Sequence, residues 1–326
     1  MMLISKDFFA KGIEIDTKKI FPMLVIATMS SGKSTLINAL LGQQILPSKN
    51  EACTAKTYSI LDDDLSEKPR LYITDMDGNT TMKEENLAEE LFRANNDDRV
   101  SDIFIQGQVK GVLNTDKALL IVDTPGPNNS QDLTHGKIME DVLDKVNGGL
   151  ILYVMNATQM GINDDKSLLM RLCRYLKTHK KSRVIFVMNK VDLIDTEKES
   201  LEQMVIDSKN YLIDNGIECP VIIPVSAQAA SIFKKALNGE ALTRSEYRSF
   251  LGCYELYMPK DYNMKSYAVT EELPNQFEEI KVRGETYRAA DIVRAIENTG
   301  IRLLEENIQK AQILSGGKLV NSVRIK

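Results

Sequence analysis

The sequence contains no tryptophan, two histidines, four cysteines and no long apolar run among its 326 residues. The cysteines lack the spacing of metal ligands, and two histidines are too few to complete a zinc site with them. Scattered cysteines are typical of a reducing compartment, so we expect a cytoplasmic protein. No segment approaches the roughly 20 apolar residues that span a bilayer, and any membrane contact is therefore expected to be peripheral or to occur through a partner.

The sequence also lacks an excess of positive charge. It has 41 lysines and arginines against 46 aspartates and glutamates, which gives a formal net charge of -5. Proteins that cover a polyanion with much of their surface are typically basic, so we expect no nucleic-acid partner. The length leaves room for one large α/β domain with additions, or for two small domains.

One nonapeptide, Ala27 to Thr35, organises the chain. The apolar residues 24–26 before it predict a buried strand, and residues 36–41 after it predict a helix that ends at Gly42. A Gly-Lys-Ser-Thr turn between a strand and a helix predicts a phosphate-binding loop, because backbone N–H groups and the helix N-terminus converge there on an anion. Ala27 stands where the first glycine of this motif usually lies.

The side chains of this loop have expected roles. Gly32 lets the backbone approach the phosphates, Lys33 reaches the β- and γ-phosphates, and Ser34 holds Mg²⁺ through its hydroxyl. The loop residues expected to contact the nucleotide are Ser30, Ser31, Gly32, Lys33, Ser34 and Thr35.

A second motif, Asp123-Thr124-Pro125-Gly126, ends the apolar run 118–122. The Asp123 carboxylate can hold a Mg²⁺-bound water, and the Gly126 N–H can contact a γ-phosphate. A plain turn is the alternative, since Asp-x-Pro-Gly is a good turn sequence. Thr54 is the candidate for a second side-chain Mg²⁺ ligand, with Thr57 as the competing choice.

A third motif, Asn189-Lys190-Val191-Asp192, predicts the base. The Asp192 carboxylate would accept hydrogen bonds from N1–H and the 2-amino group of guanine, whereas adenine offers neither donor, and such a site can discriminate by roughly 10⁴–10⁵. Lys190 would lie along the base plane and Asn189 would brace the loop. Ser226 and Ala227 would complete the base pocket with a backbone N–H.

These motifs stand at the ends of strands that alternate with helices. This order predicts a P-loop nucleotide-binding α/β fold with an extended, mostly parallel central sheet flanked by helices. The predicted strands are 57–61, 71–74, 100–113, 118–122, 150–154, 183–188 and 221–225, and the predicted helices are 82–94, 136–146, 164–177 and 197–215.

The C-terminal part has a different pattern. A capping box at 243–246 predicts a helix, residues 257–288 are polar and irregular, and 289–313 predicts two helices separated at Thr299-Gly300. We therefore divide the chain into an N-terminal neck helix and connector (1–20), a nucleotide-binding domain (21–240) and a C-terminal extension with neck helices (241–326). The apolar stripe expected to pack on residues 5–15 comprises Ile292, Ile296, Leu303, Leu304 and Ile308.

The motifs resemble those of the dynamin-like GTPases, especially the bacterial ones. The resemblance lies in residues 30–42, Leu46-Pro47 followed by 53–55, and 123–126, with a long interval between the first and last motifs, and it covers most of residues 20–230. It implies a Mg²⁺-dependent domain that hydrolyses GTP to GDP and dimerises across its nucleotide face. It further implies that Ser30 helps to hold a monovalent cation and that Ser30, Lys33 and Thr54 serve catalysis.

Two departures from this family affect the expected function. Met29 stands where many eukaryotic members have a glutamine that positions water, and loss of such a group can cost on the order of 10³–10⁵ in rate. A GTP-binding scaffold with negligible turnover is therefore the alternative, and a ribosome-associated small GTPase is a third reading. The family's long helical stalk and membrane-binding tip do not fit after residue 230, so we expect either that the chain is a fragment or that the protein does not remodel membranes unaided. A peripheral membrane or a helical partner would then be contacted outside this chain.

Overall fold

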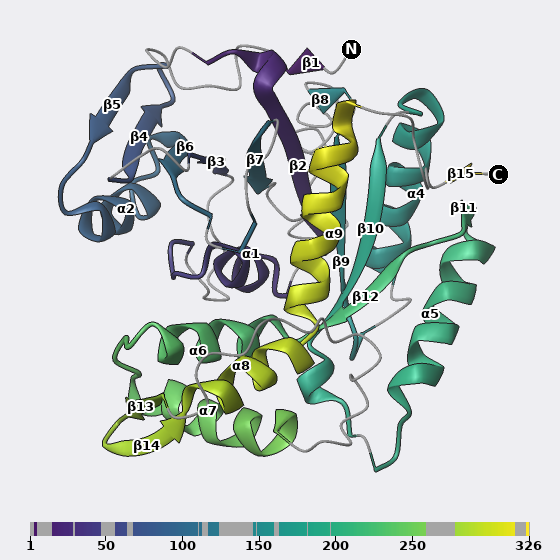
Figure 1. Ribbon diagram of the computed structural model, residues 1–326. Helices are drawn as coiled ribbons and strands as arrows, with labels where there is room; N and C mark the ends of the chain where they lie inside the picture. Colours follow the sequence, from purple (N-terminus) through teal and green to yellow (C-terminus); the bar gives the residue numbers. More distant parts are fainter. Residues whose placement is uncertain are drawn as a thin grey trace.

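The computed structural model describes residues 3–4, 15–28, 30–46, 56–63, 68–109, 111–112, 117–123, 146–147, 149–159, 163–180, 182–195, 197–258, 278–316 and 324–325. A nine-stranded sheet runs through the molecule in the order β12-β10-β9-β2-β7-β3-β6-β4-β5 (Figure 1). Its strands are β2 (Ile20–Ala27), β3 (Thr57–Asp62), β4 (Arg70–Asp75), β5 (Thr80–Lys83), β6 (Val100–Gly107), β7 (Ala118–Asp123), β9 (Leu150–Asn156), β10 (Arg183–Asn189) and β12 (Ile222–Val225).

Five neighbouring strands, β12, β10, β9, β2 and β7, run parallel to one another. Every residue of β2 and β9 is buried, which explains their unbroken apolar sequence. The carboxyl ends meet at one edge, where Asp123 pairs with Val25 and Asn189 pairs with both Val225 and Asn156. The predicted P-loop α/β fold is confirmed, and its strand-end motifs share this edge.

The outer end of the sheet is mixed. Strand β3 is antiparallel to β7 but parallel to β6, and β4 is antiparallel to both β6 and β5. The predicted strand 118–122 therefore has a parallel neighbour only on its β2 side. Strand β6 ends at Gly107 rather than at residue 113.

The predicted helix at 82–94 is wrong at its start. The Asp75 carboxylate accepts hydrogen bonds from the N–H groups of Asp77 and Asn79, which closes a hairpin and lets β5 follow. Helix α2 (Leu87–Asn95) begins only after this strand. Phe92 of this helix is 70% exposed.

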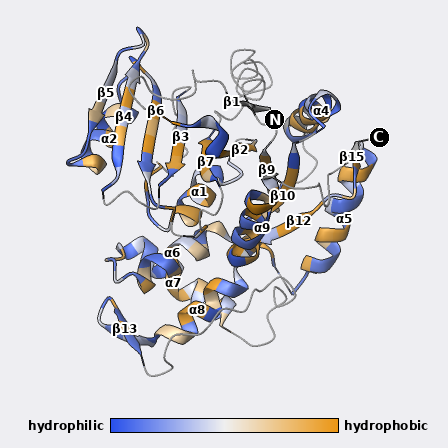
Figure 2. Ribbon diagram, turned by 45° about the horizontal axis from the view of Figure 1, so that its top comes forward, coloured by the Kyte–Doolittle hydropathy of each residue, from blue (hydrophilic) through white to orange (hydrophobic). Residues whose placement is uncertain are grey.

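Most of the other helices follow the sequence prediction closely, but α6 lies where the sequence predicts no helix. Figure 1 shows α9 crossing in front of the parallel strands, α4 and α5 beyond β10 and β12, and α6, α7 and α8 below α1. Figure 2 shows hydrophobic residues along the central strands and a mixed surface on α5 and α9. The helices are α1 (Lys33–Leu41), α4 (Asn163–Thr178), α5 (Leu201–Asp214), α6 (Ala227–Leu237), α7 (Arg244–Tyr257), α8 (Ala289–Asn298) and α9 (Ile301–Ile313).

The C-terminal helices join the common core. The expected capping box at Thr243 and Glu246 is confirmed, as is the break between α8 and α9, where Gly300 has a φ of 78°. Four stripe residues are fully buried with the sheet and α1, namely Ile292, Ile296, Leu304 and Ile308. The expected partner of this stripe, residues 5–15, lies outside the described residues except for Ile15.

Several short strands fall where the sequence predicts none. Strands β13 (Glu279–Val282) and β14 (Glu285–Arg288) form a hairpin within the predicted irregular segment 257–288. Its turn has positive φ at both Arg283 and Gly284, which suits a tight hairpin. Two further antiparallel pairs join β1 (Leu3–Ile4) to β8 (Val146–Asn147) and β11 (Ile217–Glu218) to β15 (Arg324–Ile325). The predicted helix at 136–146 lies outside the described residues except for its last residue, which belongs to β8.

Candidate functional site

The loop between β2 and α1 is held by its own polar groups. The buried Ser31 hydroxyl donates to the Thr28 carbonyl at 2.9 Å and lies 2.8 Å from the Thr28 hydroxyl. Gly32 has a φ of 83°, and a Cβ there would collide with the Asn189 amide. Ser30 also has a left-handed backbone and is exposed at the loop surface. Ser31 therefore shapes the loop, whereas Ser30 faces outward.

Lys33 and Asp123 meet beside the N-terminus of α1. The Lys33 ammonium donates to Oδ1 of Asp123 as an ion pair, and Asp123 is 5% exposed. Burial raises the pKa of the Asp123 carboxyl, and the charge of Lys33 opposes that rise. The pair places a cation and an anion together at a helix N-terminus, an arrangement that can bind a phosphate and a divalent cation.

The oxygen donors present suit Mg²⁺, which prefers carboxylates, hydroxyls and phosphates. Ser34 lies in the first turn of α1 and is half-buried, as is Thr35 one residue on. Asp123 supplies the carboxylate at the adjacent strand end. Thr54 and Gly126 lie outside the described residues, and Thr57 begins β3.

Asn189 joins two loops from distant parts of the chain. Its amide nitrogen donates to the Ser31 carbonyl at 2.8 Å, and its amide oxygen accepts from the Ala227 N–H at 3.1 Å. The side chain is buried, and its own carbonyl accepts from the Ala157 N–H. A single amide thus fixes the phosphate loop relative to the start of α6.

The backbone N–H groups of Ser226 and Ala227 are directed to protein acceptors. Ser226 donates to the Thr299 carbonyl, and Ala227 donates to Asn189. The Ser226 hydroxyl caps α6 by accepting from the Ala229 N–H. Both N–H groups therefore hold the loop in this structure, and the expected base contact through one of them stays a prediction.

Asp192 lies one turn beyond Asn189. Lys190 has a left-handed backbone, and the short 3-10 helix Val191–Leu193 carries Asp192 partly exposed above the buried Val191. Cys253 of α7 is close enough that the Asp192 charge acts on it: burial first, and then this charge, raises the pKa of the Cys253 thiol to about 12. The Asp192 charge thus acts on a residue of α7, an influence that the sequence motifs do not reveal.

Three further residues form hydrogen bonds on either side of the segment that contains Thr54. Asn38 is buried in α1 and accepts from the N–H groups of Ile45 and Leu46. The Lys56 ammonium donates to the carbonyls of Ala94 and Asn95 at the end of α2, and the Tyr58 hydroxyl also binds Asn95. The sequence held one sign of this role for Asn38, which is a polar residue among the apolar residues of the first predicted helix.

A family described as the dynamin family matches residues 23–191, a range that contains the phosphate loop, Asp123 and Asn189. The chain belongs to the dynamin family. The resemblance carried by the motifs is therefore confirmed, and the chain carries a dynamin-like GTPase domain.

Individual relatives share part of this chain. A bacterial dynamin-like protein of Nostoc punctiforme is 26% identical over 197 residues, which is 56% of this chain and 26% of that protein. The dynamin-family chain thus spans about a quarter of that relative's length. No helix in the part that the structure describes is long and apolar enough to cross a membrane.

Two of the solved structures to which this chain is similar are the following. An oligomerised bacterial dynamin pair that senses and tethers membranes has a TM-score of 0.48 and 20% identity, covering 79% of this chain and 40% of that chain. Era in complex with MgGDPNP and 16S ribosomal RNA has a TM-score of 0.37 and 18% identity, covering 79% of this chain and 70% of that chain.

Proposed function

We propose that this dynamin-family chain binds GTP with Mg²⁺ and hydrolyses it to GDP and phosphate. The proposal is carried mainly by Asn189, which lies three residues before Asp192. Its side-chain amide binds both the phosphate loop and the Ser226-Ala227 loop. A phosphate-binding end and a base-binding end are thereby held at a fixed separation. The family membership supports a guanine nucleotide as the ligand.

At the phosphate end, the ion pair between Lys33 and Asp123 must open when the triphosphate enters. Lys33 then binds the β- and γ-phosphates, and the Asp123 carboxylate is released toward the metal. Mg²⁺ would be held by Ser34, Thr54 and Asp123, directly or through water, and would neutralise charge on the phosphates. The protein positions the attacking water and stabilises charge, and no covalent intermediate is required.

At the base end, Asp192 accepts from N1–H and the 2-amino group of guanine. Lys190 lies along the base plane. The next N–H in the first turn of α6, that of Gln228, is the donor we assign to the base in place of the two N–H groups that the protein uses itself.

Hydrolysis would be stimulated by pairing of two copies across the nucleotide face. Ser30 is exposed at the outer surface of the phosphate loop, where it can help to hold a monovalent cation near the partner. We propose a cytoplasmic location, with any membrane contact peripheral.

Phosphate release measured over a range of protein concentrations tests this function. A rate per chain that rises with concentration supports an enzyme stimulated by its own dimerisation. Lys33→Ala should abolish GTP binding, because the loop loses its phosphate ligand, whereas Lys209→Ala on the exposed side of α5 serves as the control and should leave binding unchanged. Unchanged GTP affinity in Lys33→Ala would refute the assignment.

A second candidate is a GTP-binding scaffold with negligible turnover. It is favoured by Met29, which cannot position water as the glutamine of many family members does. Tight GTP binding with phosphate release that stays at background over all protein concentrations would select this function instead.

A further inference from the structure

Beyond the two aspartates in its first turn, helix α4 presents a positive surface, which we call the basic face. Residues 166–180 contain five cations and no carboxylate. None of the five forms an ion pair or hydrogen bond within the described residues. Met170, spaced one helical turn from its charged neighbours, is 55% exposed in their midst. The cations are Lys166, Arg171, Arg174, Lys177 and Lys180.

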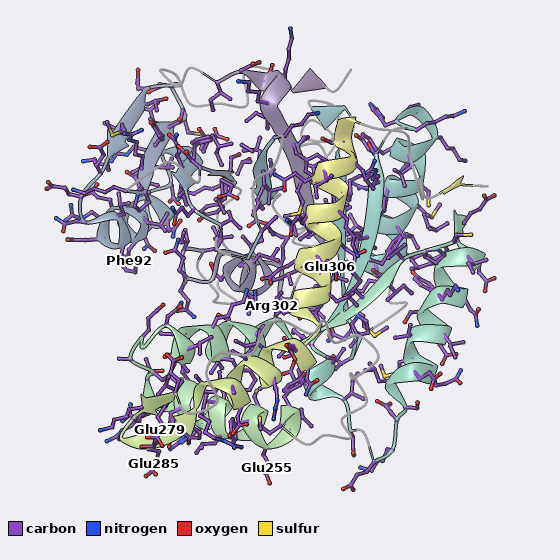
Figure 3. The ribbon with its side chains drawn as sticks, viewed as in Figure 1. Phe92, Glu255, Glu279, Glu285, Arg302 and Glu306 are labelled. Carbon is purple, nitrogen blue, oxygen red and sulfur yellow. The ribbon has the colours of Figure 1, made fainter. Side chains whose placement is uncertain are left out.

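Helix α2 and its flanks present the opposite charge, in what we call the acidic face. Residues 84–98 contain six carboxylates and one arginine. Figure 3 shows Phe92 on the outer side of α2, where it is 70% exposed. Glu85 and Asp98 have no ion-pair partner in the described part of the chain.

Local ion pairs neutralise the acidic face only in part. Arg93 binds Glu89 and Glu90, and Glu90 is also reached by Lys83. The remaining pairs join Arg70 to Glu84 and Arg99 to Asp97. Across residues 70–99, eight carboxylates face four cations, so the face stays negative.

The two faces lie at opposite ends of the sheet. Helix α2 packs against β4 and β6 near one edge, whereas α4 connects β9 to β10 near the other. They therefore cannot meet within one chain. Each consists of a helix with one exposed apolar side chain surrounded by charge, and the charges are of opposite sign.

We propose that the acidic face of one copy binds the basic face of the next, head to tail. Phe92 and Met170 would supply a buried aromatic–sulfur contact, and the surrounding charges would orient the encounter. Such a heterologous contact leaves both outer faces free and so extends into a chain of copies. It uses no residue of the proposed nucleotide site and needs no nucleotide.

A second copy fits these observations better than a membrane or a nucleic acid. An anionic surface would satisfy the basic face, but it would leave Phe92 in water and would repel the acidic face. A second copy covers both faces with one contact. Because the charges at its rim remain near solvent, the contact should weaken as salt rises.

Sedimentation velocity of the nucleotide-free chain at about 0.05 M and about 0.5 M salt tests the proposal. We expect concentration-dependent species larger than one copy at low salt and a single copy at high salt. Glu85→Lys with Asp98→Lys reverses the acidic face, and Arg174→Glu with Lys177→Glu reverses the basic face. Each pair should weaken self-association at low salt by at least about tenfold.

Mixing the two face variants is the decisive experiment. The reversed acidic face of one variant is complementary in charge to the reversed basic face of the other, so self-association should return. Lys209→Glu with Arg248→Glu changes charge on other exposed residues and should associate as the unmodified chain does. A single copy at all concentrations and salts, or face variants that associate normally, would overturn the proposal. So would binding of the basic face to phosphatidylserine vesicles or to DNA without self-association. Because GTP binding is measured separately, failure here is distinguishable from failure of the proposed function.

Discussion

Asn189 shows how one buried amide can assemble a site from distant residues. Its nitrogen and oxygen bind different loops, one before α1 and one at the start of α6. Because the side chain is buried, each lost hydrogen bond leaves a desolvated backbone group without a partner. Asn189, three residues before the aspartate that we propose for base recognition, thus also holds the phosphate loop.

Replacing Asn189 with alanine should therefore affect both stability and binding. We expect the free energy of unfolding to fall by about 1–3 kcal/mol and GTP affinity to fall by at least about tenfold, since the orphaned Ser31 and Ala227 groups no longer fix the two loops. Urea unfolding and calorimetry measure the two effects. Asn215→Ala, which removes a side-chain bond at the end of α5, is the control and should lower stability alone. Normal GTP affinity in Asn189→Ala would contradict this role.

The reactivity of the Cys253 thiol can report on Asp192 in the proposed base-binding loop. Burial, together with the Asp192 charge, raises its pKa from 9.0 to about 12. At about pH 8 the thiol should therefore react with a disulfide reagent far more slowly than the exposed Cys219. Asp192→Asn should speed the reaction by removing one of the two causes, and a rate unaffected by that change would show that the two residues are not close.

The raised pKa of the Cys253 thiol also determines how the stability of the fold changes with pH. The folded thiol keeps its proton to higher pH than the thiol of the unfolded chain. Its contribution therefore favours the folded state below pH 9 and is lost as the pH rises toward 12.

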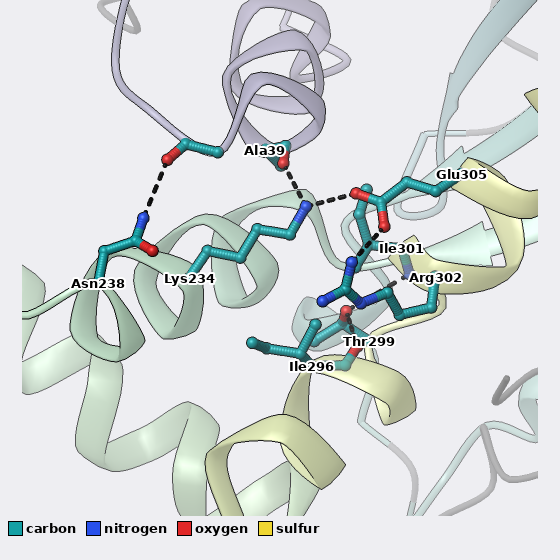
Figure 4. A network of polar contacts seen from close by, with 9 residues as sticks. Ala39, Lys234, Asn238, Ile296, Thr299, Ile301, Arg302 and Glu305 are labelled. Carbon is teal, nitrogen blue, oxygen red and sulfur yellow. Dashed lines mark hydrogen bonds and ion pairs between the residues drawn. The ribbon is translucent and has the colours of Figure 1, made fainter. Parts of the chain in front are cut away.

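At the scale of elements, a buried ionic network joins α1, α6 and α9. The Lys234 ammonium donates to the Ala39 carbonyl at 2.7 Å and to the Glu305 carboxylate, which also accepts from Arg302 at 2.9 Å (Figure 4). Lys234 and Glu305 expose 9% and 4% of their side chains. The end of the phosphate-loop helix is therefore fixed to the last long helix through charge as well as apolar packing.

Removing one charge of the buried Lys234–Glu305 pair should cost more than replacing the whole pair. Lys234→Ala leaves the Glu305 carboxylate buried without its ammonium, and we expect a loss of about 3–5 kcal/mol in the free energy of unfolding. Lys234→Met with Glu305→Leu should recover much of that loss. Lys235→Ala breaks a more exposed pair with Glu246 and should cost about 1 kcal/mol or less. Equal losses for Lys234→Ala and Lys235→Ala in denaturant unfolding would contradict the importance of burial.

The elements that the sequence predicts correctly are those with a strong local signal. Strands β2, β9 and β10 read as continuous apolar runs, and α7 carries a complete capping box. Strands β5 and β13–β14 are short, polar and half-exposed, so no hydrophobic alternation marks them. They form because the Asp75 turn and the Arg283-Gly284 turn reverse the chain.

At the scale of the molecule, the parallel strands explain why so much of the site could be predicted. Motifs at strand ends are brought together by the sheet itself, so Asp123 and Asn189 lie beside the phosphate loop. Asn189 accepts the hydrogen bond of the Ala227 N–H. This contact joins residues far apart in sequence, so no local pattern encodes it. The same holds for Lys56, which binds the end of α2.

The measurement that tests the central claim most directly is calorimetric titration of the chain with GTP and with ATP in the presence of Mg²⁺. We predict binding of GTP and an affinity for ATP lower by about 10⁴-fold or more, a preference that Asp192→Ala should remove. Equal heats for GTP and ATP, or no heat for either, would contradict the account.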